Sequence, residues 1–144
     1  MFQSRTVVAL CGFLLCATMP AIAASPGKSL YDRLGGKAAI SAVVERFAAT
    51  QLADTRIAKH YRMTDIAAWK GHLVALICKA TGGPCEYKGR PMAKAHARRN
   101  ISEAEFNWTA EHLVAALNHF KVPAKEKGEV VAIFVSLKDQ VVGQ

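Results

Sequence analysis

Apolar side chains recur every three or four positions along most of the chain, which is the period of a helix with one buried face. One such stripe, in residues 37–52, consists of Ile40, Val43, Val44 and Phe47. Another, in residues 64–81, consists of Ile66, Trp69, Leu73, Leu76 and Ile77. No segment alternates apolar and polar residues convincingly with a period of two. The pattern therefore predicts an all-α fold.

Capping residues and helix breakers set the expected boundaries. Ser29, Thr64 and Ser102 are the expected N-caps, and Glu105 completes a capping box with Ser102. The expected helices are a short one after Ser29 that ends at Gly35, then 37–52, a helix from Thr64 to about Thr81, a short one over 92–98, one from Ser102 to Phe120, and a last one after Pro123.

Residues 1–24 differ from the rest of the chain. They carry one charge, at Arg5, then an apolar run over 7–19 and mostly small residues up to Ala24. This layout predicts a signal peptide cleaved near Ala23 or Ala24. A membrane anchor is disfavoured, because about 13 apolar residues are too few for a span that needs roughly 20. We expect residues 25–144 to form one exported, periplasmic domain, monomeric and without stable membrane insertion.

The charge of the chain is strongly positive. Cleavage would remove one of the 19 basic residues and none of the 11 acidic ones, leaving a formal net charge of +7. Such an excess is compatible with a nucleic-acid partner or an anionic surface. The basic residues are scattered through the helical pattern instead of forming one tract. We therefore predict no nucleic-acid partner and expect some basic residues to serve a ligand with acidic groups.

Two cysteines, Cys78 and Cys85, remain after cleavage. An oxidising compartment permits them to pair if the chain reverses at Gly82, Gly83 and Pro84. The sequence leaves a disulfide and two free thiols open, and we expect pairing in the exported protein. No Cys-x-x-Cys-His motif supports covalent c-type haem attachment.

The mature chain contains five histidines, of which His72 and His96 lie in the most informative places. His96 follows a long loop on a short predicted helix, and His72 lies beside the stripe of Trp69 and Leu73. Neither has the closely spaced ligands that a zinc site requires. Two imidazoles among apolar side chains suit haem better, although the same side chains also fit an ordinary core.

Several separated motifs carry a resemblance to a known family. They are Leu30-Tyr31-Asp32-Arg33-Leu34-Gly35-Gly36, Val43-Val44-Glu45-Arg46-Phe47, Leu52-Ala53-Asp54, Thr81-Gly82-Gly83-Pro84, Tyr87-x-Gly89-x-x-Met92 and Ala95-His96. In this order they resemble group I truncated haemoglobins over about residues 29–138. The resemblance implies a two-over-two helical globin around a non-covalent b-type haem, with His96 as the proximal iron ligand.

The resemblance also implies which residues surround the haem. The expected contacts are Phe47, Tyr61, Thr64, Trp69, Lys70, Leu73, Leu76, Tyr87, Met92 and Phe106. Lys70, Arg90 and Lys94 are candidate partners of the propionates, and for each the alternative is an ordinary solvated side chain. Thr64 and Tyr87 are candidates for contact with the haem edge. His72 resembles a second iron ligand of some cyanobacterial members, or it turns outward to a propionate, and the sequence leaves both readings open.

The chain departs from the family where bound oxygen is held. Ala48 stands in place of a usual tyrosine, Leu73 in place of a glutamine, and Tyr61 in place of a phenylalanine. The hydrogen-bond network for oxygen is therefore absent or rebuilt around Tyr61 and Trp69.

The resemblance leaves three functions open. The first is binding or transport of a diatomic gas (oxygen, nitric oxide or carbon monoxide). The second is enzymatic, as a nitric-oxide dioxygenase or a peroxidase-like protein. The third is electron transfer with an electron-donor protein through a six-coordinate haem. A helical adaptor without a cofactor would leave the ordered motifs unexplained.

Overall fold

The computed structural model describes residues 27–144, so the predicted signal peptide lies outside the described residues. The α-helices are α1 (Leu30–Arg33), α2 (Gly36–Ala53), α3 (Ile66–Ala80), α4 (Met92–His96), α5 (Glu103–His119) and α6 (Ala124–Val135). Two 3₁₀ turns are η1 (Ala58–Tyr61) and η2 (Lys138–Gln140). Within residues 27–144 the only β pairing is an isolated bridge between Ile101 and Val142. The all-α prediction is confirmed.

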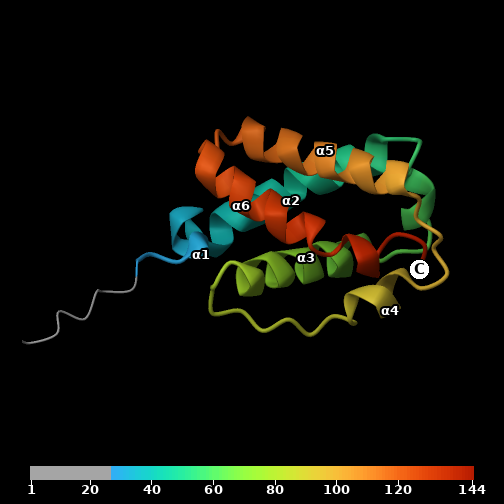
Figure 1. Cartoon of the computed structure of the whole chain (residues 1–144), viewed down its shortest axis with the longest axis horizontal. Helices are drawn as coiled ribbons and strands as arrows, with labels where there is room; N and C mark the ends of the chain where they lie inside the picture. Colours follow the sequence, from blue (N-terminus) through green and yellow to red (C-terminus); the bar gives the residue numbers. More distant parts are fainter. Residues whose placement is uncertain (1–26) are drawn as a thin grey trace, which may run out of the picture.

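Helix α2 is central to the packing because it contacts both α3 and α5, while α6 packs on α5 (Figure 1). Val43 and Phe47 of the α2 stripe form the larger buried cluster with Leu113, Ala116, Leu117 and Val130, and Trp69 and Leu73 of the α3 stripe pack against it while partly buried. A smaller cluster joins Ile40 and Val44 of α2 to Cys78 of α3. Two packed helix pairs thus enclose the apolar side chains.

Two of the three predicted N-caps are confirmed. The Ser29 hydroxyl accepts a hydrogen bond from the Asp32 N–H, and Ser102 forms the predicted capping box with Glu105. The third is wrong, because Asp65, and not Thr64, caps α3 by accepting from the Ala68 N–H.

The short helix α4 ends earlier than predicted. It stops at His96 and not at Arg98, because Ala97 is extended and Arg98 has a left-handed φ of 64°. The chain therefore turns away immediately after His96.

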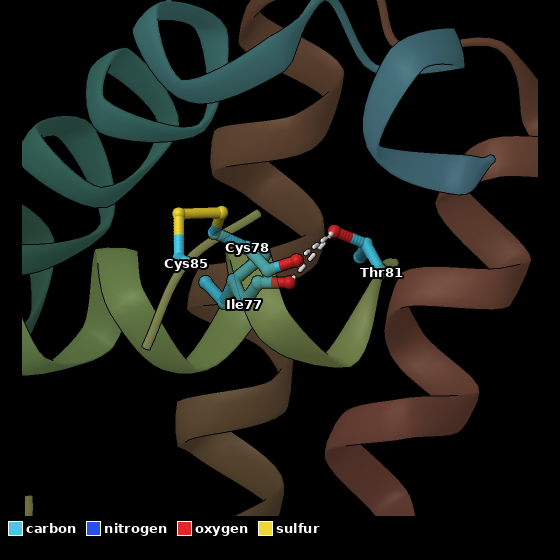
Figure 2. Close-up of a disulfide and its surroundings, with 4 residues drawn as sticks. All are labelled: Ile77, Cys78, Thr81 and Cys85. Carbon is cyan, nitrogen blue, oxygen red and sulfur yellow. Dashed lines mark hydrogen bonds between the residues drawn. A yellow bond between two sulfur atoms is a disulfide. The ribbon is translucent and has the colours of Figure 1, made fainter. Parts of the chain in front are cut away.

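The structure pairs Cys78 of α3 with Cys85, as expected for the exported protein (Figure 2). The Thr81 hydroxyl donates to the carbonyl oxygens of Ile77 and Cys78 and closes the end of α3. Residues 82–91 then run back beside α3 to α4 (Figure 1). No helix within residues 27–144 is long and apolar enough to cross a membrane.

Candidate functional site

The candidate site is a cavity of about 410 Å³ between α3, residues 87–90 and α4. Its volume falls in the range of roughly 300–1,000 Å³ that is usual for small-molecule and cofactor sites. The predicted site residues that line it are Tyr61, Thr64, Trp69, His72, Leu73, Leu76, Tyr87, Met92 and His96. Residues far apart in the sequence, His72 and His96 among them, are thus brought to one cavity.

His96 is held in a defined orientation by its own helix. Its Nδ1 lies 2.9 Å from the Met92 carbonyl oxygen. Because a carbonyl only accepts, Nδ1 carries the proton, and Nε2 of the neutral ring is left with a free lone pair. Burial lowers the pKa of His96 by more than the hydrogen bond to Met92 raises it, and the nearby charges of Arg99 and Arg90 lower it further. These conditions produce a neutral imidazole with one available nitrogen, which is the form that ligates a metal.

His72 reaches the same cavity from α3, but its surroundings differ. The side chain is exposed at the cavity rim. Its ring meets the Tyr87 ring edge-on, with centroids 6.2 Å apart and an interplanar angle of 73°. In this structure His72 therefore lies against the wall formed by residues 87–90.

Aromatic side chains form the inner wall of the cavity. The ring centroids of Tyr61 and Trp69 are 4.6 Å apart, and those of Trp69 and Phe47 are 6.3 Å apart. A second cavity of about 140 Å³ shares Tyr61, Trp69 and His96 with the first and is also lined by Phe47 and Phe106. Burial raises the pKa of Tyr61 to about 12, so its phenol remains protonated and able to donate a hydrogen bond.

Polar groups converge on the cavity from its edge. The Thr64 hydroxyl oxygen is buried and has no hydrogen-bond partner within the described part of the chain. Lys88, Arg90 and Arg99 also line the cavity and bring three positive charges. An unpartnered buried hydroxyl and a positive rim fit a ligand that has an apolar body and acidic groups at its edge.

Three residues singled out in the sequence are not part of this lining. The Lys70 ammonium lies 2.8 Å from a Glu45 carboxylate oxygen and borders a separate cleft between α2 and α3. Lys94 is exposed and lines neither cavity. Ala48 is 2% exposed and also lines neither, so its small side chain does not enlarge the site.

The sequence interpretation missed the contribution of His60 and Arg99. An Arg99 guanidinium N–H donates to the His60 carbonyl oxygen over 2.6 Å. His60 Nε2 lies 3.1 Å from Glu105, which ties η1 to the start of α5. Both residues line the cavity. They lie in a 3₁₀ turn and a loop, where no helical period marks the inward positions.

The donor set fits haem better than a bare metal ion. Within residues 27–144, no group of three or more His, Cys, Asp or Glu side chains could hold a metal ion. His96 instead offers one oriented nitrogen to an aromatic and aliphatic cavity with a basic rim. A planar apolar macrocycle with acidic substituents and an axial site for one imidazole matches these features.

Comparisons with known proteins point to the same class. Residues 29–142 match the family model described as bacterial-like globin. The chain is 34% identical over 113 residues to a group 1 truncated haemoglobin of Mycolicibacterium paratuberculosis, covering 78% of this chain and 83% of the relative. It is 32% identical over 116 residues to a group 1 truncated haemoglobin of Nostoc sp., covering 81% of this chain and 98% of the relative.

Solved structures extend the similarity to the fold. The truncated haemoglobin of Tetrahymena pyriformis in its Fe(III) form matches with a TM-score of 0.77 and 27% identity, covering 81% of this chain and 100% of that one. The 2/2 haemoglobin of Synechococcus sp., solved in the cyanomet state with covalently attached haem, matches with a TM-score of 0.75 and 33% identity at the same coverage.

Proposed function

The chain belongs to the bacterial-like globin family as a group 1 truncated haemoglobin, and from this we propose that it holds a non-covalent b-type haem in the 410 Å³ cavity and binds diatomic gases there. The single observation that carries the proposal is the hydrogen bond from His96 Nδ1 to the Met92 carbonyl. It fixes the tautomer and the orientation that an axial imidazole needs.

The surrounding residues have distinct roles in this proposal. Bound haem supplies an iron centre at which a diatomic ligand is held. Tyr61, Trp69 and Leu73 pack on the macrocycle and exclude water. The Tyr61 phenol and the Thr64 hydroxyl are the hydrogen-bonding groups available inside, while Arg90 and Lys88 balance the propionates at the rim. Tyr61 thereby replaces the donor that is missing at Ala48.

His72 supports a second candidate function, which is redox chemistry. Its side chain lines the same cavity as His96, so a second imidazole borders the site. We propose that His72 is an exchangeable iron ligand that competes with an incoming gas. If His96 and His72 both held the iron when no gas is bound, bound haem would supply chemistry suited to electron transfer from a donor protein, and nitric-oxide dioxygenation or peroxide reduction are the enzymatic alternatives.

We further propose that the protein works after export, as a periplasmic monomer. The signal-like layout of residues 1–24 motivates this location. The disulfide between Cys78 and Cys85 supports it, because disulfides persist in oxidising compartments.

Replacing His96 with glycine tests the haem site. We expect the variant to lose haem during gel filtration, because the axial bond is removed, and to regain a bound-haem spectrum when free imidazole is added. His119→Ala, an exposed histidine at the end of α5, is the matched control and should retain haem. Native stoichiometry and an unchanged imidazole-ligated spectrum in His96→Gly would refute the assignment.

A further inference from the structure

We propose that Tyr87 is a positioning residue that holds the His72 ring at the cavity rim and thereby sets how often His72 reaches the iron. The inference rests on the haem site proposed above. It assigns to the wall opposite α3 a role in ligand exchange, in addition to contact with the haem edge.

The contact between the two rings is the first step. His72 and Tyr87 meet edge-on at 6.2 Å and 73°. Aromatic rings favour this arrangement, because the positive edge of one faces the negative face of the other. His72 is nevertheless exposed and lines the cavity. The ring therefore lies at the boundary between solvent and cavity, with Tyr87 as its neighbour.

Tyr87 is the fixed member of the pair. Its hydroxyl donates to the Arg90 carbonyl oxygen over 2.9 Å, which closes a tight turn. A side chain at Gly89 would collide with the Tyr87 ring, so the turn and the ring are fitted to each other. Two residues before Tyr87, Cys85 is bonded to Cys78 of α3, the helix that carries His72. The disulfide before Tyr87 and the hydrogen-bonded turn after it thus restrain the distance between Tyr87 and the His72 backbone.

His72 is the movable member. No side-chain hydrogen bond or ion pair found within residues 27–144 involves its ring. Its backbone is fixed in the middle of α3, so only rotation about the side-chain bonds moves the ring between Tyr87 and the cavity interior. The contact with Tyr87 stabilises only the position in which the His72 ring lies against residues 87–90. Losing an aromatic contact of this kind should shift the balance toward iron about two- to tenfold.

The decisive variants are Tyr87→Leu and Tyr87→Phe, compared in the haem-loaded, ferrous protein. Leucine removes the ring, whereas phenylalanine keeps it and loses only the hydroxyl. We expect Tyr87→Leu to slow carbon monoxide association about two- to tenfold, because His72 then occupies the iron more often. Tyr87→Phe should stay close to wild type. His72→Leu should abolish the effect of Tyr87→Leu in the double variant.

A structural readout accompanies the kinetics. In the diamagnetic carbon monoxide complex His72 is displaced from iron, and we expect nuclear Overhauser contacts between the His72 and Tyr87 ring protons. Their absence, or unchanged association in Tyr87→Leu, would overturn the inference. An equal effect of Tyr87→Phe would overturn it too and assign the role to the hydroxyl at the haem edge. Failure of wild type to bind haem would refute the proposed function instead, and is visible in the absorption spectrum.

Discussion

Removal of the disulfide should destabilise the fold and loosen one wall of the site. The bond joins Cys78 to Cys85 at a sequence separation of 7. Closing so short a loop lowers the entropy of the unfolded chain by an amount worth about 2–3 kcal/mol at 25 °C. We expect reduction of the native protein to lower its free energy of unfolding by about this amount.

Two measurements separate the bond from the packing of the sulfur atoms. Chemical denaturation of the oxidised and the reduced native protein isolates the bond, because reduction leaves both sulfurs in place. The Cys78→Ala/Cys85→Ala variant should be less stable than the reduced protein, because the Cys78 side chain is fully buried and alanine leaves a small gap. The reductant should have no effect on this variant, which makes it the control.

The effect should also be local. Residues 82–91 form no helix, and the disulfide fastens this segment to α3. Their amide hydrogens should therefore exchange faster after reduction, while the exchange rates in α5 change little. Coincident denaturation midpoints for the oxidised and reduced protein would refute the reasoning, since they would mean that the bond adds nothing to the stability of the fold.

Two further predictions concern ionisable groups at the edges of the site. Hydrogen bonds from Lys59, the Ser102 backbone and His60 lower the pKa of Glu105 to about 2, despite its burial. Glu105→Gln should therefore cost about 2 kcal/mol above pH 4.5, and urea titrations should show this difference vanish as the pH falls through about 2. Burial raises the pKa of Tyr61 to about 12, because the folded protein favours the neutral phenol. The contribution of the neutral phenol to the free energy of unfolding is therefore complete below pH 10 and is lost as the pH rises through about 12. In an ultraviolet titration, Tyr61→Phe should lack the phenol that ionises near pH 12 in wild type. The same titration curve for wild type and variant would contradict the prediction.

The helices could be predicted because their signals are local and repeated. The stripe through Ile40, Val44 and Phe47 needs only the helical period, and α2 spans Gly36–Ala53 within about a residue of the expected bounds. The choice between Thr64 and Asp65 as a cap could not be made in this way. Both residue types cap helices well, and only the fold decides which side chain faces the free N–H groups.

Site residues could be predicted where their position on a helix is enough to direct the side chain toward the cavity. Trp69, Leu73 and Leu76 share one face of α3, and all three line the cavity. Lys70 was misplaced because a long side chain on the edge of that face can reach either way, and Glu45 on α2 attracts its ammonium. Arg99 lies in an irregular loop, where neighbouring residues have no fixed direction relative to one another.

The two imidazoles of the site, His96 and His72, differ in how tightly the structure restrains their rings, and under the proposed function this difference assigns their roles. His96 is tied to the Met92 carbonyl, four residues earlier in its own short helix, so its free nitrogen is held in one direction. His72 has only an edge-on contact with Tyr87, of a kind worth about 0.5–1.5 kcal/mol, at an exposed rim. A restrained ligand loses little freedom on binding iron, whereas a mobile one must give up its alternative position. In the proposed haem site, His96 would therefore anchor the haem and His72 would leave the iron when a gas molecule arrives.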